Sequence, residues 1–91
     1  MEIWVPNAFT PGNDPLNNEF LAYGSGIAEF NMIFFDRWGE KIFETDTINK
    51  GWDGTYKDKT CPEGVYVYNI KARGIDGSKQ VNKSGHLSLI R

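Results

Sequence analysis

The strongest indication of the fold is the segment from Phe34 to Gly77, which reads FFDRWGEKIFETDTINKGWDGTYKDKTCPEGVYVYNIKARGIDG. Short apolar runs recur in it, and each run ends at a turn built from glycine with an acid, a proline or a tryptophan. Side chains that alternate with a period of two between such turns are typical of antiparallel strands. The sequence therefore predicts an all-β domain rather than a helical or nucleotide-binding one.

The size and composition of the chain indicate one small globular unit. Its 91 residues are enough for a single domain, and we expect residues 1–91 to form it. Six Phe, four Tyr and three Trp supply large areas for burial. The single cysteine, Cys61, cannot form an intramolecular disulfide, so the fold cannot depend on one. The residues after Met1 lack the features of a signal peptide, so we expect any export signal to lie upstream in a longer protein.

Several function classes are disfavoured by what the sequence lacks. The formal net charge is −2 and the basic residues form no stripe, so nucleic-acid binding is not expected. No apolar run approaches the ~20 residues that span a membrane, so direct membrane insertion is not expected. The sequence shows no Ser-His-Asp set, no metal-ligand spacing of Cys or His, and no phosphate loop. We therefore expect neither a catalytic site nor a cofactor.

The alternation of apolar residues predicts about seven short strands in an Ig-like antiparallel β-sandwich. Residues 30–35 are largely apolar on both faces, which predicts that this strand is central in a sheet. Gly85 indicates a bend or a bulge in the last strand. The expected strands cover residues 2–5, 20–23, 30–35, 41–44 and 65–72, with a return strand that begins at 78–81 and ends at 86–91.

Two turns and one buried ring follow from local chemistry. Asp36-Arg37-Trp38-Gly39 predicts a tight hairpin turn in which Gly39 takes a positive φ. Asp76-Gly77 predicts a two-residue hairpin. Trp52, in the longest irregular stretch, is expected to fill the core where the chain crosses between sheets.

Three features suggest binding, and each has a structural alternative. Asp14, Asn17 and Asn18 bring oxygen ligands together in an early loop, but Asx turns explain the same residues, so they are weak metal candidates and no metal is expected. Trp4, Trp38 and Trp52 could stack on sugar rings, as in a carbohydrate-binding or adhesive module, but a core position for Trp52 and a hairpin lid for Trp38 explain the same residues. The terminal strand at 86–91 is either an ordinary closing strand or one that a partner pairs with by β-augmentation.

Six motifs occur in order along almost the whole chain, from Ile3 to Arg91: VPNAFTP, a polar loop ending in NNEF, IFFDRWGEKIFET, GWDGTYKDK, PEGVYVYNIKARGIDG and KSGHLSLIR. Together they resemble the type B C-terminal sorting domain of the type IX secretion system, also called the gliding-motility-associated C-terminal domain. In the early loop, Gly12 to Asn18 departs from the glycine-rich pattern usual in that family.

The resemblance implies an address label on a larger cargo protein. Such domains are Ig-like sandwiches at the C-terminus of large secreted or cell-surface proteins, which include adhesins of gliding bacteria. The cargo passes through the periplasm, where the folded label is recognised. The implied partners are outer-membrane components of the type IX translocon and a type B-specific outer-membrane protein, and we expect a monomer.

The resemblance also assigns residues by position. Arg37 and Trp38 are residue types that dominate the energetics of interfaces, although Trp38 could instead fold back as a lid on the hairpin. The residues implied in partner recognition are Arg37, Trp38, Gly39, Lys83, Gly85, Leu87 and Arg91. The residues implied in structural motifs are Trp52, Asp53, Gly54, Pro62, Gly64 and Tyr66.

Overall fold

The computed structural model describes residues 2–9, 19–77 and 79–90, and within these ranges the chain forms β-strands and no helix. No helix that could span a membrane occurs in this part of the chain. The strands are β1 (Glu2–Trp4), β2 (Ala8–Phe9), β3 (Tyr23–Ser25), β4 (Ile27–Phe35), β5 (Lys41–Thr45), β6 (Thr55–Tyr56), β7 (Lys59–Thr60), β8 (Gly64–Gly74) and β9 (Val81–Leu89).

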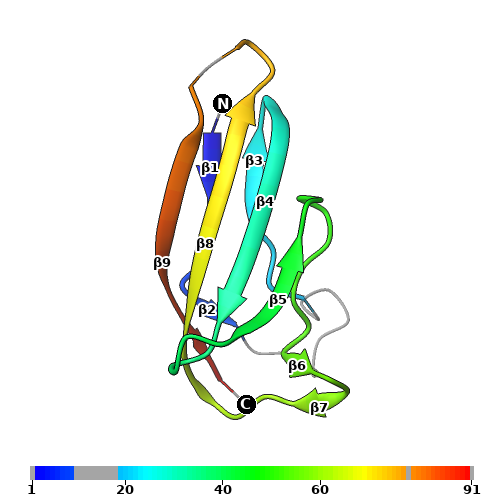
Figure 1. Cartoon of the computed structure of the whole chain (residues 1–91), viewed down its shortest axis with the longest axis vertical. Coiled ribbons are helices and arrows are strands. Elements are labelled where there is room, and N and C mark those ends of the chain that lie inside the picture. Colours follow the sequence, from blue (N-terminus) through cyan, green and yellow to red (C-terminus); the bar gives the residue numbers. More distant parts are fainter. Residues whose placement is uncertain (1, 10–18, 78, 91) are drawn as a thin grey trace.

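One sheet forms the larger layer, with the strand order β2-β9-β8-β4-β5 (Figure 1). The pairs β9–β8, β8–β4 and β4–β5 are antiparallel, as the sequence predicts. β2 pairs with β9 in parallel, which departs from a wholly antiparallel arrangement. Pro6 lies between β1 and β2 and has no N–H to continue a ladder, so the chain can leave one sheet there and join the other.

The second layer covers the inner face of this sheet. It consists of the antiparallel pair β1–β3 and of a backbone bridge between Phe20 and Trp52. Ile3 and Val5 pack from this layer against the core. The all-β sandwich prediction is therefore confirmed, with nine strands among the described residues where about seven were expected.

Strict alternation on β8 explains how the core forms. Tyr66, Tyr68, Ile70 and Ala72 are buried on one face, whereas the residues between them are exposed or half-buried. β8 pairs with β4 on one side and with β9 on the other. β4 in turn lies between β8 and β5, so the prediction that the strand at 30–35 lies inside a sheet is confirmed. The apolar face is continuous across the three long strands, and its removal from water is the main source of stability.

An aromatic cluster fills the space between the layers. Trp52 is 0% exposed, and its ring centroid lies 5.4 Å from that of Phe34 and 5.1 Å from that of Tyr66. Phe20 meets Phe34 edge to face at 5.4 Å. Such offset and edge-to-face contacts are the favoured geometries for aromatic pairs. The prediction that Trp52 fills the core is confirmed.

The hairpin between β4 and β5 is held by the carboxylate of Asp36. Its Oδ1 accepts hydrogen bonds from the N–H groups of Trp38 and Glu40, both at 2.9 Å. The N–H of Gly39 donates to the Asp36 carbonyl at 3.1 Å, and Gly39 has φ of 85°. The predicted turn and its glycine are confirmed.

The two-residue hairpin predicted at Asp76-Gly77 is wrong. Ala72 pairs with Val81, so residues 73–80 separate the two paired strands. β8 continues beside β4 to the pair Gly74–Ile27, and the next N–H, that of Ile75, donates to the Gly26 carbonyl. The end of β8 therefore follows β4 and not β9.

Two strand details also differ from the prediction. Gly85 pairs with Tyr68 without a register shift, so β9 has no bulge there; a shift occurs instead at Phe34/Phe35 on β4. The strand expected at 20–23 is reduced to the Phe20 bridge, and the strand lies at Tyr23–Ser25. Both differences reflect partners on distant strands, which local patterns do not reveal.

Candidate functional site

The tip of the β4–β5 hairpin presents Arg37 and Trp38 to solvent. The Trp38 side chain is 79% exposed, so of the two alternatives the ring is exposed rather than folded over the core. The Arg37 guanidinium carbon lies 5.1 Å from the centroid of the Trp38 ring. This cation–π contact is worth about 0.5–1 kcal/mol at an exposed position, and it keeps the two side chains together.

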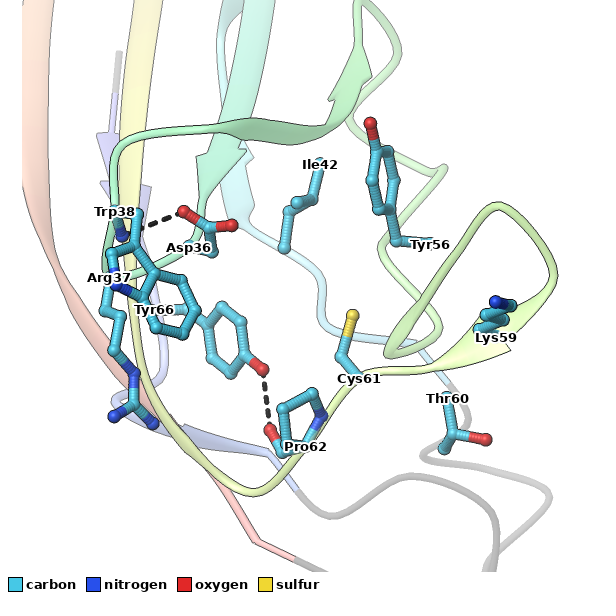
Figure 2. Close-up of a pocket in the computed structure, with 10 residues that line it drawn as sticks. All are labelled: Asp36, Arg37, Trp38, Ile42, Tyr56, Lys59, Thr60, Cys61, Pro62 and Tyr66. Carbon is cyan, nitrogen blue, oxygen red and sulfur yellow. Dashed lines mark hydrogen bonds between the residues drawn. The ribbon is translucent and has the colours of Figure 1, made fainter.

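A cavity of about 210 Å³ opens beside this tip (Figure 2). Its walls come from the hairpin, from β5 and β6, and from the segment that leads from β7 into β8. The Cys61 sulfur points toward Ile42 across the hollow. The lining residues are Asp36, Arg37, Trp38, Ile42, Tyr56, Lys59, Thr60, Cys61, Pro62 and Tyr66.

Hydrogen bonds from the core fix the wall that leads into β8. The Tyr66 hydroxyl donates to the Pro62 carbonyl at 2.6 Å (Figure 2). The Cys61 N–H donates to the Gly54 carbonyl at 2.8 Å. Tyr66 in turn packs against the buried ring of Trp52. The cavity wall is therefore attached directly to the aromatic core.

The segment Trp52-Asp53-Gly54 anchors the hairpin of β6 and β7. Asp53 Oδ1 accepts hydrogen bonds from the N–H of Thr55 at 3.0 Å and from its hydroxyl at 2.6 Å. The indole N–H of Trp52 donates to the Thr55 carbonyl at 2.9 Å. Beyond the turn, the Tyr56 hydroxyl donates to Glu40 Oε1 at 3.1 Å, which ties β6 to the β4–β5 hairpin. These contacts place Tyr56 at the cavity.

The structure thus brings three sequence motifs to one end of the sandwich. The hairpin motif Arg37-Trp38-Gly39 lies beside the strand opener, which contains Pro62 and Tyr66. A β-carbon added at Gly64 would lie 3.2 Å from Arg37 Nη2. Arg37 therefore packs over a position that has no side chain. Trp52, Asp53 and Gly54 support the same end from behind.

The C-terminal motif, KSGHLSLIR, lies away from the cavity. Lys83, Gly85 and Leu87 are on β9, and none of them lines the cavity. Leu87 is 1% exposed in the core, so a partner could touch its side chain only after a change in the fold. The Leu87 side chain is therefore not part of the recognition surface proposed below. Arg91 lies outside the described residues.

Glu44 on β5 carries a lowered pKa. Glu44 accepts hydrogen bonds from Lys41 Nζ at 2.9 Å and from Asn31 Nδ2 at 3.0 Å. The hydrogen bond from Lys41, then that from Asn31, and then the charge of Lys41 hold the pKa of Glu44 below its ordinary value.

The weak metal candidates Asp14, Asn17 and Asn18 lie outside the described residues. Among residues 2–9, 19–77 and 79–90, no group of three or more His, Cys, Asp or Glu side chains could hold a metal ion.

Sequence reasoning missed several residues of the site. Ile42, Tyr56 and Cys61 line the cavity, but the sequence assigns none of them a role in a site. Asp36 could have been found, because an acid at the first position of a turn commonly accepts hydrogen bonds from the backbone.

Residues 3–89 match the family model of the CHU_C type IX secretion signal domain. The chain belongs to this family. Membership associates the signal domain with the type IX secretion machinery and with a cargo that is secreted or held at the outer-membrane surface. Comparisons with curated proteins and with solved structures gave no match.

Proposed function

We propose that this signal domain is a C-terminal sorting signal that directs a larger cargo protein across the outer membrane by binding translocon components. Recognition involves the folded domain, as a monomer, together with a type B-specific outer-membrane partner. The domain acts by binding and has no catalytic role.

The observation that carries this proposal is the exposed Arg37–Trp38 pair at the rim of an apolar cavity. Trp and Arg are enriched among the residues that dominate binding energy, and such anchors are most effective next to a pocket that excludes water. A Trp ring that is 79% exposed gains little from folding alone, because most of its apolar area remains in water. The pair is therefore available to stabilise a complex.

The size of the cavity favours a protein partner over a small-molecule ligand. Its volume of about 210 Å³ is below the range of roughly 300–1,000 Å³ typical of small-molecule sites. An apolar side chain from a partner, placed between Trp38 and Pro62, would fill it. The partner's backbone could then contact Arg37 at the rim.

The core suits a label that is read while folded. Trp52, Phe34 and Tyr66 pack together without any disulfide, so a change in redox conditions during export would not open the fold. The cavity wall is bonded to this core through Tyr66. The binding surface is therefore preorganised, which lowers the entropic cost of recognition.

The proposal is tested by fusing the domain to a periplasmic reporter in a host with a type IX system. We expect the fusion to appear in the medium or on the cell surface in the intact host, and to stay in the periplasm when the translocon gene is deleted. The reporter without the domain is the control. Periplasmic retention of the fusion in both hosts would disprove the proposal.

A carbohydrate-binding or adhesive module is the second candidate, and one further observation favours it. Trp4 and Tyr23 are 62% and 48% exposed on β1 and β3, with ring centroids 5.5 Å apart. Trp52, in contrast, is buried and cannot stack on a sugar. A glycan array with the Trp4→Ala and Trp38→Ala variants as controls addresses this candidate, and the absence of binding by the unaltered domain would eliminate it.

A further inference from the structure

The outer edge of β9 is largely unpaired. On one side, β9 pairs with β8 over its whole length, from the pair Val81–Ala72 to the pair Leu89–Gly64. On the other side, β2 pairs only with Ser88 and Leu89. Among the described residues, no strand lies against the main chain of residues 81–87 on that outer side. Figure 1 shows β9 as the outermost long strand, with β2 at its lower end.

The direction of the free backbone groups follows from one hydrogen bond. The N–H of Ser88 donates to the carbonyl of Asn7 at 3.0 Å, so it points away from β8. Backbone groups alternate in direction along an antiparallel strand, and β8–β9 has no register shift. The N–H and C=O groups of Asn82, Ser84 and His86 therefore also point outward.

The opposite edge of the sheet has features that discourage strand addition, whereas β9 has few. β5 has five residues, lies beside the register shift at Phe34/Phe35, and carries the ion pair between Lys41 and Glu44. Short length, irregularity and charge are the usual means by which natural edges avoid pairing. β9 has nine residues, contains no proline, and is regular throughout. The backbone groups that point outward from β9 belong to Asn82, Ser84 and His86.

We propose that the edge of β9 along Asn82, Ser84 and His86 receives an extended segment of a secretion-machinery protein as an added β-strand. This inference rests on the proposed function and specifies how the partner is held. β2 already occupies the lower part of the same edge, so the added strand continues the sheet above it. Main-chain hydrogen bonds supply the affinity in this mode of recognition.

The proposal also explains the placement of the C-terminal motif. Gly85 and Leu87 face the core, where they pack under Tyr68 and within the apolar cluster. Their effect is to keep β9 extended and firmly attached to β8. The C-terminal motif therefore holds β9 in place on β8, and the edge of β9 that faces away from β8 keeps its backbone N–H and C=O groups available for pairing.

Proline at position 84 tests the edge selectively. Ser84→Pro removes an N–H that points outward, so the ladder between β8 and β9 keeps its hydrogen bonds, whereas an added strand loses one and meets the proline ring. Ser84→Ala is the matched control, because it removes only the hydroxyl. Both variants are fused to the periplasmic reporter, and their folding is checked by circular dichroism and thermal melting. We expect export of folded Ser84→Pro to fall about tenfold or more and that of Ser84→Ala to stay unchanged.

The outcomes separate this inference from the proposed function. Equal export of folded Ser84→Pro and of the unaltered domain would overturn the added strand and leave the sorting role intact. Failure of the unaltered fusion to leave the periplasm would overturn both. If Ser84→Pro does not fold, Asn82→Pro at the start of the strand replaces it, with Asn82→Ala as its control.

Amide hydrogen exchange in the isolated domain tests the open edge without any substitution. We expect the amides of Asn82, Ser84 and His86 to exchange at least about tenfold faster than those of Lys83 and Gly85, which bond to β8. Protection of these amides would overturn the proposal. Protection together with a dimeric mass by light scattering would identify a second copy of the chain as the occupant instead.

Discussion

The ring of Tyr68 lies over Gly85 on the neighbouring strand, so close that a β-carbon at position 85 would be 2.6 Å from the Tyr68 hydroxyl oxygen. The two residues are direct cross-strand partners on β8 and β9. Tyr68 is itself buried, so the ring has little freedom to move aside. The glycine therefore makes room for an aromatic ring that completes the buried face of the sheet.

Gly85→Ala should lower the free energy of unfolding by about 1–3 kcal/mol, because the added methyl group overpacks the contact with Tyr68. Urea unfolding measures the change. Ser84→Ala on the same strand is the control and should lie within about 0.5 kcal/mol of the unaltered domain. Unchanged stability of Gly85→Ala would mean that Tyr68 can shift freely.

Trp52→Phe should lower the free energy of unfolding by about 1–3 kcal/mol. The change leaves a cavity among Phe20, Phe34 and Tyr66, and it removes the indole N–H that donates to the Thr55 carbonyl. Trp38→Phe is the matched control, since Trp38 is exposed, and its unfolding free energy should change by less than about 0.5 kcal/mol. Similar losses in the two variants would contradict the different burial of the rings.

Trp38→Ala should reduce export without affecting the fold. The exposed ring contributes little to stability, so we expect the melting temperature to stay almost unchanged, whereas loss of an interface anchor costs ≥ ~2 kcal/mol, or roughly thirtyfold in affinity. The measurement is the fraction of the reporter fusion found outside the cell. Trp4→Ala alters another exposed tryptophan, on β1, and should leave export unchanged; a comparable loss in both variants would argue against a site at the hairpin tip.

The pKa of Glu44 should lie below its ordinary value of 4.5 and rise toward it when Lys41 is replaced by methionine. Because the folded state lowers this pKa, Glu44 stabilises the fold above about pH 4.5, and that contribution is lost as the pH falls through the lowered folded-state pKa. Titration of the Glu44 carboxyl carbon by NMR measures the shift directly. Glu44→Gln should lack this part of the acid-induced loss of stability, and an identical acid dependence would contradict the assignment.

Elements whose cause is local could be predicted from the amino-acid sequence. The alternation from Tyr66 to Ala72 gave a strand with one buried face, and Asp36 to Gly39 specified a turn through a carboxylate acceptor and a glycine at positive φ. The apolar Trp52 within a polar stretch indicated a buried ring. The ordered motifs also identified the family, which the match over residues 3–89 confirms.

Which of these elements contact one another depends on the folded structure. The parallel pairing of β2 with β9, the long connection at 73–80, and the cavity between Trp38 and Pro62 all depend on contacts between distant segments. A window of sequence reports periodicity and turn chemistry, whereas strand neighbours are chosen by the free energy of burying the whole apolar face at once. For the same reason the unpaired edge at Ser84 became visible only when every strand had found its partners.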